Sequence, residues 1–292
     1  MSNTITLSSG QELDLSHSSD SKPVIKTLTN GCTVVGYLVQ DDDCENPLKT
    51  CEGMGSIFTA RRSAGDKDLE EFRKARGFDD DYKPTRKANP LAVVLDVYSH
   101  SGECYAVSGS IEAMRFPDRQ WDVGAGSAVW VPDTYCIENI WINAVKGLLP
   151  KEAVVYYTSK LQADGTCKNP KDLNRVTLRI TNMPGLPPRY YKTFKLAYQA
   201  AMKLYGVKLP SDFSAIKYRE SVAMCKGVLE SFNAWLAGDC WGVCVDVFDD
   251  EGKPIDEDAC WGHIGGKWAN EALEDQMNCQ IKHHSTSAEV AS

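Results

Sequence analysis

The sequence lacks any apolar run long enough to cross a bilayer. Its longest apolar stretches are Leu91–Leu95 and Val243–Val247, and Asp246 interrupts the second; a membrane-spanning helix needs roughly 20 apolar residues. Residues 1–20 also lack the basic start and the apolar core of a secretory signal. We therefore expect a chain that has no membrane segment and stays in the cytoplasm.

Metal and nucleotide motifs are also missing. The 11 cysteines are scattered singly with no CxxC pair, although zinc sites and disulfide frameworks depend on recurring cysteine spacings. Cys240 and Cys244 would lie on one face of a strand, about 13 Å apart, which is too far to share an ion. Neither GxxxxGK[ST] nor GxGxxG occurs. These absences predict free thiols, no metal and no cofactor.

Positive charge is scarce relative to negative charge. The chain has 32 Lys and Arg against 40 Asp and Glu, a formal charge of −8, which argues against a general nucleic-acid binder because such proteins cluster basic residues against phosphate. The acids gather at Asp41–Asp43, at Asp79–Asp81 and between Asp246 and Asp258. Solvated loops are the simplest interpretation of these runs. The functional interpretation is an acidic surface that meets a basic groove of another protein.

The sequence contains alternating β patterns and, more strongly in its second half, helical periodicity. Asn30-Gly31 predicts a tight hairpin turn within Val24–Gln40, and the apolar spacing of Asp66–Arg76 predicts a helix that Gly77 ends. Further strands are expected at 55–61, 91–98, 104–108, 127–131, 175–181, 240–248 and 259–264, and further helices at 133–147, 190–205, 212–237 and 268–282. The pattern predicts an α+β fold in which antiparallel hairpins pack against several helices.

A change in composition near residue 169 predicts two domains. Four prolines lie between residues 170 and 188, a density typical of a junction. We expect a flexible tail at 1–22, a β-rich N-terminal domain at 23–168, a helix-hairpin-helix C-terminal domain at 169–282 and a second flexible tail at 283–292.

The segment from Gly238 to Gly266 is the most distinctive part of the chain. It places Trp241 and Trp261, each followed by a glycine, in the two arms of an expected hairpin. A glycine opposite a tryptophan leaves room for the ring across the strands. The pattern first predicts a structural contact.

The same segment carries a resemblance. The stretch from Ala234 to Gly265, with its Trp-Gly-Val-x-Val and Ala-Cys-Trp-Gly-x-Ile-Gly elements, resembles a hairpin of uncharacterised proteins from bacteriophages and plasmids, which a segment similar to Leu91–Gly102 and then Arg119–Asp122 commonly precedes. The resemblance covers about a third of the chain, in two pieces, and supplies no catalytic residues. It implies a mobile-element origin, and by analogy an inhibitor of a host defence system, of the anti-CRISPR or anti-restriction type.

The leading functional hypothesis is therefore a non-enzymatic viral or plasmid protein that binds a host protein or protein complex in the host cytosol. It predicts neither direct nucleic-acid binding nor membrane binding, and it leaves a homo-oligomer open. The residues expected to form the binding surface are Asp41, Asp42, Asp43, Trp241, Asp249, Asp250, Glu251 and Trp261.

Two alternatives remain open from the sequence. One is a small-substrate enzyme with His100 or His263 as general base at a strand end. Its other candidate residues are Asp122, Asp246 and Asp258 as partners and Cys104 or Cys260 as nucleophile. The second alternative is an acidic DNA mimic, which the nearly equal number of Lys and Arg residues disfavours.

Two weaker ideas concern metal ions. Asp246, Asp249 and Asp256 could supply oxygens to a divalent cation, although the EF-hand spacing is absent. His283 and His284 lack the i, i+4 spacing of a shared helical metal site and are expected to be solvated.

Overall fold

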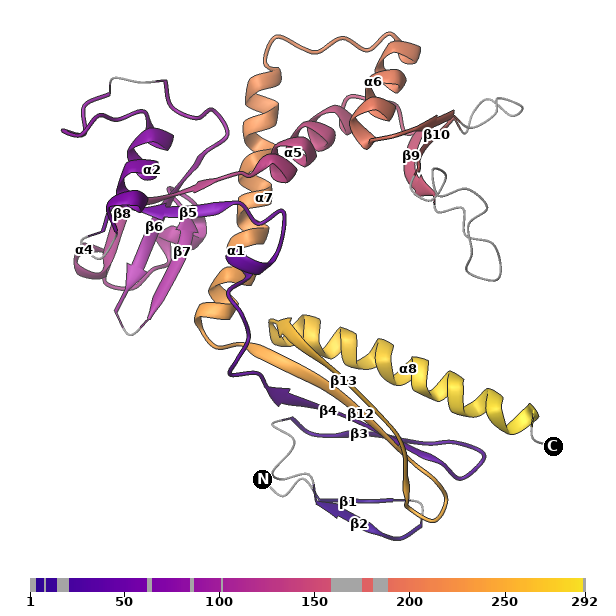
Figure 1. Ribbon diagram of the computed structural model, residues 1–292. Coiled ribbons are helices and arrows are strands. Elements are labelled where there is room, and N and C mark those ends of the chain that lie inside the picture. The colour runs from indigo at the N-terminus through magenta and orange to yellow at the C-terminus, as the bar shows by residue number, and fades with distance from the viewer. Residues whose placement is uncertain are drawn as a thin grey trace. The chain divides into compact units, whose positions relative to one another are not determined.

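The computed structural model describes residues 4–7, 9–14, 21–61, 65–84, 87–100, 102–158, 175–180 and 189–290 (Figure 1). The strands are β1 (Thr4–Thr6), β2 (Glu12–Asp14), β3 (Val24–Thr27), β4 (Thr33–Gln40), β5 (Ser56–Thr59), β6 (Val93–Ser99), β7 (Glu103–Val107), β8 (Val123–Val131), β9 (Ala153–Thr158), β10 (Arg175–Ile180), β11 (Arg189–Tyr191), β12 (Cys240–Phe248) and β13 (Pro254–Ile264). The helices are α1 (Pro47–Thr50), α2 (Asp66–Arg76), α3 (Ile111–Met114), α4 (Arg119–Asp122), α5 (Thr134–Lys146), α6 (Phe194–Tyr205), α7 (Phe213–Leu236) and α8 (Gly266–Val290). The strands form antiparallel sheets, which confirms the predicted α+β class.

The chain divides into two compact units. Unit 1 contains Met1–Cys51, Tyr98–Tyr105 and Val228–Ser292, and unit 2 contains Glu52–Val97 and Ala106–Gly227. This division differs from the domain boundary expected near residue 169. The reason is long-range strand pairing, because β4 from the start of the chain lies beside β12 from its last quarter.

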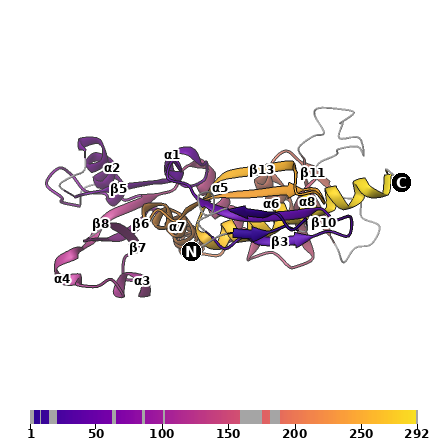
Figure 2. The same cartoon turned by 90° about the horizontal axis from the view of Figure 1, so that it is seen from below.

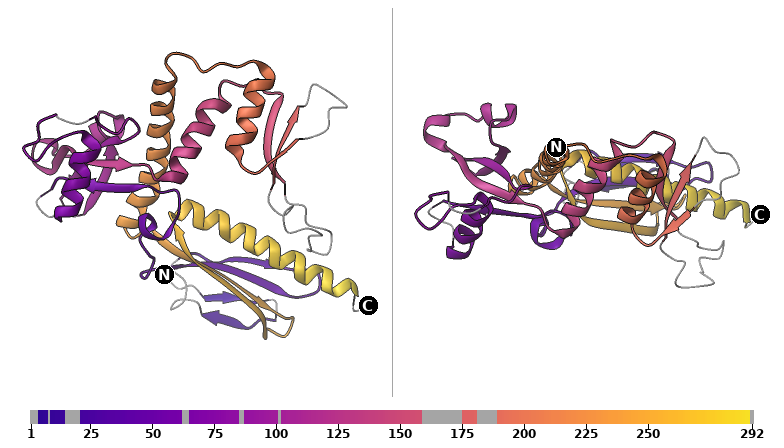
Figure 3. Two further views of the ribbon diagram at one scale, coloured as in Figure 1. Left: turned by 45° about the horizontal axis from the view of Figure 1, so that its top comes forward. Right: turned by 90° about the horizontal axis from the view of Figure 1, so that it is seen from above.

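Unit 1 is built on a four-stranded sheet in the order β13-β12-β4-β3. Figure 2 shows these strands side by side, and Figures 1 and 3 show α8 running along the sheet. Successive side chains of a strand point to opposite faces, so β4 presents Val34 and Leu38 to the core beneath α8 and presents Val35 and Tyr37 to the other face. The sheet is therefore covered on both faces.

Both expected tails contain regular structure. Thr4–Thr6 pairs with Glu12–Asp14, and Ile5 and Leu7 are buried against the sheet of unit 1. The isolated apolar residues of this segment therefore complete a core, which a polar composition alone did not indicate. At the other end, α8 continues to Val290 instead of ending at residue 282.

The sheet in the order β5-β8-β6-β7 lies mostly in unit 2, which also contains a second sheet in the order β11-β10-β9. Helix α2 matches its predicted bounds, and Gly77 ends it with a φ of 72°, a left-handed conformation that glycine adopts without strain. Helix α6 begins four residues later than predicted, because residues 189–191 pair with β10 as β11. None of the helices in the described ranges combines the length and apolar character that crossing a bilayer requires.

The carboxylate of Asp133 organises the start of α5. One oxygen accepts a hydrogen bond from the backbone N–H of Cys136 at 2.7 Å, and the other accepts from Gly53 and Gly55 at 3.1 and 3.2 Å. Asp133 is thus both the N-cap of α5 and the anchor of the loop that leads into β5.

We expect Asp133→Asn to lower the free energy of unfolding by about 1–3 kcal/mol at pH 7, because the amide presents an N–H group to backbone donors. Burial opposes ionisation of Asp133, but hydrogen bonds from Cys136, Gly55 and Gly53 outweigh it and lower its pKa. A carboxyl group whose pKa falls on folding stabilises above its unfolded pKa of about 4, and this contribution is lost as pH falls through the folded pKa. Urea unfolding should therefore show a smaller wild-type advantage near pH 3, and an unchanged advantage would contradict this account.

Candidate functional site

The predicted binding residues fall into two groups at opposite ends of the β12–β13 hairpin. Asp249, Asp250 and Glu251 form its turn, whereas Trp241 and Trp261 lie near its open end. The seven residue steps from Trp241 to Phe248 correspond to roughly 23 Å along the strand. A single side chain of a partner cannot contact both groups, so they are two separate candidate surfaces.

Strand pairing brings the first acidic run to the open end of the hairpin. The backbone N–H of Asp41 donates to the carbonyl of Cys240 at 2.9 Å, which continues the ladder between β4 and β12 past the end of β4. The Asp41 carboxylate accepts the N–H of Gly262 at 2.9 Å, across 221 residues of sequence. Asp42 and Asp43 follow and are exposed.

These residues line a hollow of about 740 Å³, which we call the acidic hollow. Its lining residues are Gln40, Asp41, Asp42, Asp43, Cys44, Glu45, Pro47, Thr50, Cys51, Trp261, Gly262 and Ile264. Among these described residues there are four carboxylates and no lysine or arginine. The hollow therefore combines net negative charge with one aromatic surface.

Trp261 is held in the hollow by the glycine across the hairpin. A Cβ atom at Gly242 would lie 2.5 Å from the Trp261 ring, so the ring lies directly over the bare backbone of β12. This confirms the cross-strand contact predicted from the Trp-Gly pattern. Trp261 nevertheless remains 54% exposed, and a large exposed aromatic side chain fixed in place is typical of a binding surface.

Trp241 is part of the packing of unit 1. Its indole N–H donates to the Asp239 carboxylate at 2.6 Å, and its ring packs against the core under α8. Trp241 does not line the acidic hollow. Trp241 and Trp261 are each followed by a glycine in the sequence, but they lie in different environments.

The acids of the hairpin turn stabilise the turn itself. Asp249 accepts hydrogen bonds from the backbone N–H groups of Glu251 at 3.0 Å and Lys253 at 2.8 Å. Burial, followed by the charges of Asp249 and Asp250, raises the pKa of the nearby Cys32 thiol. The acids of the hairpin turn therefore stabilise the turn and place negative charge there, apart from the acidic hollow.

The candidate catalytic histidines do not share a site with the acidic hollow. His100 is exposed at the end of β6, and His263 lies on β13 opposite Trp241. The Nε2 atom of His263 is buried and has no hydrogen-bond partner within the described residues. Neither histidine lines the acidic hollow.

The candidate partners and nucleophiles are similarly spread. Asp246 accepts the Tyr37 hydroxyl at 3.0 Å, and burial raises the pKa of its carboxyl group. Asp258 lies opposite Val245 on the exposed edge strand. Asp122 ends the short helix α4, Cys260 is exposed on β13, and burial raises the pKa of the Cys104 thiol.

The cysteines that the structure describes are free, as predicted, while Cys167 lies outside the described residues. Burial raises the pKa of Cys225 to about 12, and burial together with neighbouring Cys44 and acids raises that of Cys240 to about 12. A thiol with such a pKa is protonated at neutral pH and is a poor nucleophile.

Comparisons with protein-family models, curated proteins and solved structures gave no match to this chain. The resemblance to phage and plasmid proteins therefore stays a hypothesis.

A second half-exposed tryptophan extends the surface beside the hollow. Trp268, near the start of α8, is 56% exposed and lines a smaller hollow of about 170 Å³. Ile264 lines both hollows. The sequence pattern does not indicate Trp268, because its place next to Ile264 depends on where α8 begins.

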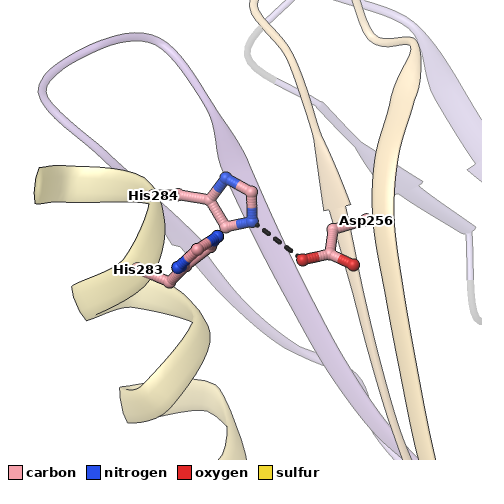
Figure 4. A group of neighbouring side chains, drawn as sticks. All are labelled: Asp256, His283 and His284. Atoms are coloured by element: carbon pink, nitrogen blue, oxygen red, sulfur yellow. Dashed lines mark hydrogen bonds and ion pairs between the residues drawn. The ribbon is translucent and has the colours of Figure 1, made fainter. Parts of the chain in front are cut away.

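The proposed triple carboxylate site does not assemble. Asp256 lies opposite Val247 and therefore shares its face of the hairpin, whereas Asp246 occupies the other face with Tyr37. Asp249 is engaged in the turn. Asp256 instead meets His284, whose Nε2 atom lies 3.1 Å from the carboxylate (Figure 4). The expectation that His284 is solvated is wrong, because its side chain is only 15% exposed.

Proposed function

We propose that unit 1 binds a basic segment of another protein at the acidic hollow. The observation that carries this proposal is the composition of its lining, in which Asp41, Asp42, Asp43 and Glu45 surround the half-exposed Trp261 with no basic residue among them. An arginine of the partner suits this site best. Its guanidinium group can lie over an indole ring while it donates hydrogen bonds to carboxylates.

The combination matters more than the charge alone. An exposed ion pair contributes about 0–1 kcal/mol, so solvated acids such as those of the hairpin turn offer little affinity by themselves. A tryptophan supported from behind by Gly242 adds apolar contact area in a fixed orientation. Trp268 lines the smaller hollow that shares Ile264 with the acidic hollow, and it is available for a second aromatic contact.

We extend the proposal to an inhibitor that acts on a host defence protein. This extension rests on the resemblance of residues 234–265 to proteins of mobile elements. A protein that covers a basic, nucleic-acid-binding groove of a host nuclease would need a surface of this charge. This role does not require the carboxylates to reproduce the spacing of DNA phosphates, as a DNA mimic would.

The binding proposal can be tested with a fluorescently labelled peptide that carries arginines between glycine and serine residues. We expect Asp42→Asn with Asp43→Asn to weaken binding about tenfold, equivalent to about 1.4 kcal/mol. Trp261→Ala should weaken it by a similar factor. Fluorescence anisotropy at physiological salt measures both effects.

The matched control is Asp250→Asn with Glu251→Gln, which removes the same formal charge from the hairpin turn. This control should leave the dissociation constant within about twofold, since exposed charges beyond roughly 8 Å are screened. Equal weakening by the two double variants would show binding to net charge only. That result, or full binding by Trp261→Ala, would overturn the proposed site.

A further inference from the structure

The end of α8 carries two histidines that the packing of the helix orients. Ala269, Leu273 and Met277 recur every four residues and are buried against the sheet of unit 1. His284 follows Met277 by seven residues, about two helical turns, and so returns to this buried face. His283 is rotated by about 100° from it and lies at the exposed flank of the helix.

The sheet places a carboxylate opposite these rings. Asp256 pairs with Val247 in the register of β12 and β13, and Val247 belongs to the core that α8 covers. Side chains of directly opposed residues share one face of a sheet. Asp256 therefore faces α8, as Figure 4 shows.

The distances between the three side chains suit a shared metal ion. One ligand atom from each of Asp256, His283 and His284 lies within 4.8 Å of the others. His284 Nε2 and the Asp256 oxygen are 3.1 Å apart. Two ligand atoms of a tetrahedral zinc ion are separated by a similar distance, about 3.3 Å. The two imidazole rings are perpendicular, with centroids 5.0 Å apart.

The surroundings hold this group in position while leaving it accessible. The side-chain amide of Asn30, from the turn between β3 and β4, donates to the backbone carbonyl of His284 at 3.2 Å. This contact ties the helix end to the sheet. His283 is exposed and the Asp256 side chain is 36% exposed, so an ion can enter and a water molecule can fill a fourth position.

We propose that Asp256, His283 and His284 bind a divalent transition-metal ion, with Zn²⁺ as the best match. Two imidazole nitrogens and one carboxylate oxygen form a donor set that Zn²⁺ favours, whereas Ca²⁺ and Mg²⁺ prefer oxygen ligands. The ion links α8 to the edge strand β13. The site lies towards the hairpin turn and is independent of the acidic hollow.

The test uses the full chain without a histidine tag, stripped of metal with a chelator and titrated with ZnCl₂ in a calorimeter. We expect one ion per chain and a loss of affinity of about tenfold or more in His283→Ala and in Asp256→Asn. The matched control is His100→Ala, which removes an exposed histidine elsewhere and should bind as the wild type does. Co²⁺ should give the intense visible absorption of tetrahedral coordination, and both site variants should lose it.

Two outcomes would overturn the proposal. One is an absence of Zn²⁺ binding to the wild type under conditions in which the chain is folded by circular dichroism. The other is equal Zn²⁺ affinity in the wild type, His283→Ala and Asp256→Asn. His283→Ala is the decisive variant because its exposed side chain can be removed without opening the core, unlike that of His284.

Discussion

Trp130→Ala should lower the free energy of unfolding by about 3–5 kcal/mol, the range for removing a buried large aromatic side chain. Trp130 lies in β8, the strand between β5 and β6, and its side chain is fully buried. Its indole N–H donates to the carbonyl of Met54 at 2.8 Å. The substitution therefore leaves both a cavity and an unpaired backbone acceptor, and denaturant unfolding followed by circular dichroism measures the loss.

Trp130→Phe separates these two effects. Phenylalanine keeps most of the apolar volume but cannot donate to the Met54 carbonyl, so we expect a smaller loss, about 1–3 kcal/mol. A loss below about 1 kcal/mol for Trp130→Ala would mean that the sheet of unit 2 does not depend on this residue, contrary to its position in the structure.

Leu273→Ala should lower the free energy of unfolding by about 2–5 kcal/mol, as other buried leucine truncations do. Leu273 is 4% exposed and packs with Met277 over Gly36 of β4, where a Cβ atom would lie only 2.5 Å from the Met277 sulfur. Helix and sheet are in close contact there, so small shifts of the neighbouring residues cannot fill the cavity that the substitution leaves. Thermal and urea unfolding both report the effect.

The control for this prediction is Glu274→Ala, the exposed neighbour on the same helix. It should change stability by no more than about 0.5 kcal/mol. Similar losses for the two variants would contradict the orientation of α8. Leu273→Ala should also weaken Zn²⁺ binding at Asp256, because the position of the two histidines depends on the docking of this helix.

The hairpin of β12 and β13 carries the two proposed sites of unit 1 at separate places. The acidic hollow lies where β4 ends beside Trp261, and the proposed metal site lies towards the turn, under the end of α8. A partner with a basic segment and a metal ion would not compete for the same residues. Binding of peptide and of Zn²⁺ can therefore be measured independently in the same preparation.

Much of the local structure could be predicted from the sequence because its causes are local. Asp66–Arg76 has helical apolar spacing and a terminal glycine, and the structure has a helix with these bounds. The Asn30-Gly31 turn joins β3 and β4, with Gly31 at a φ of 89°. The Trp-Gly pattern likewise predicted the contact between Trp261 and Gly242, because a glycine across a hairpin accommodates a ring regardless of the rest of the fold.

The sites depended on contacts between distant parts of the chain. Asp41–Asp43 meets Trp261 only because β4 pairs with β12, and no periodicity within either segment specifies that partner. The histidines meet Asp256 only because Leu273 and Met277 fix the rotation of α8 while the pairing of Asp256 with Val247 fixes its face. Composition and spacing thus determined the α+β class and the acidic, aromatic character of the chain. Tertiary packing determined which of these side chains converge, because convergence depends on the register and rotation of elements separated in sequence.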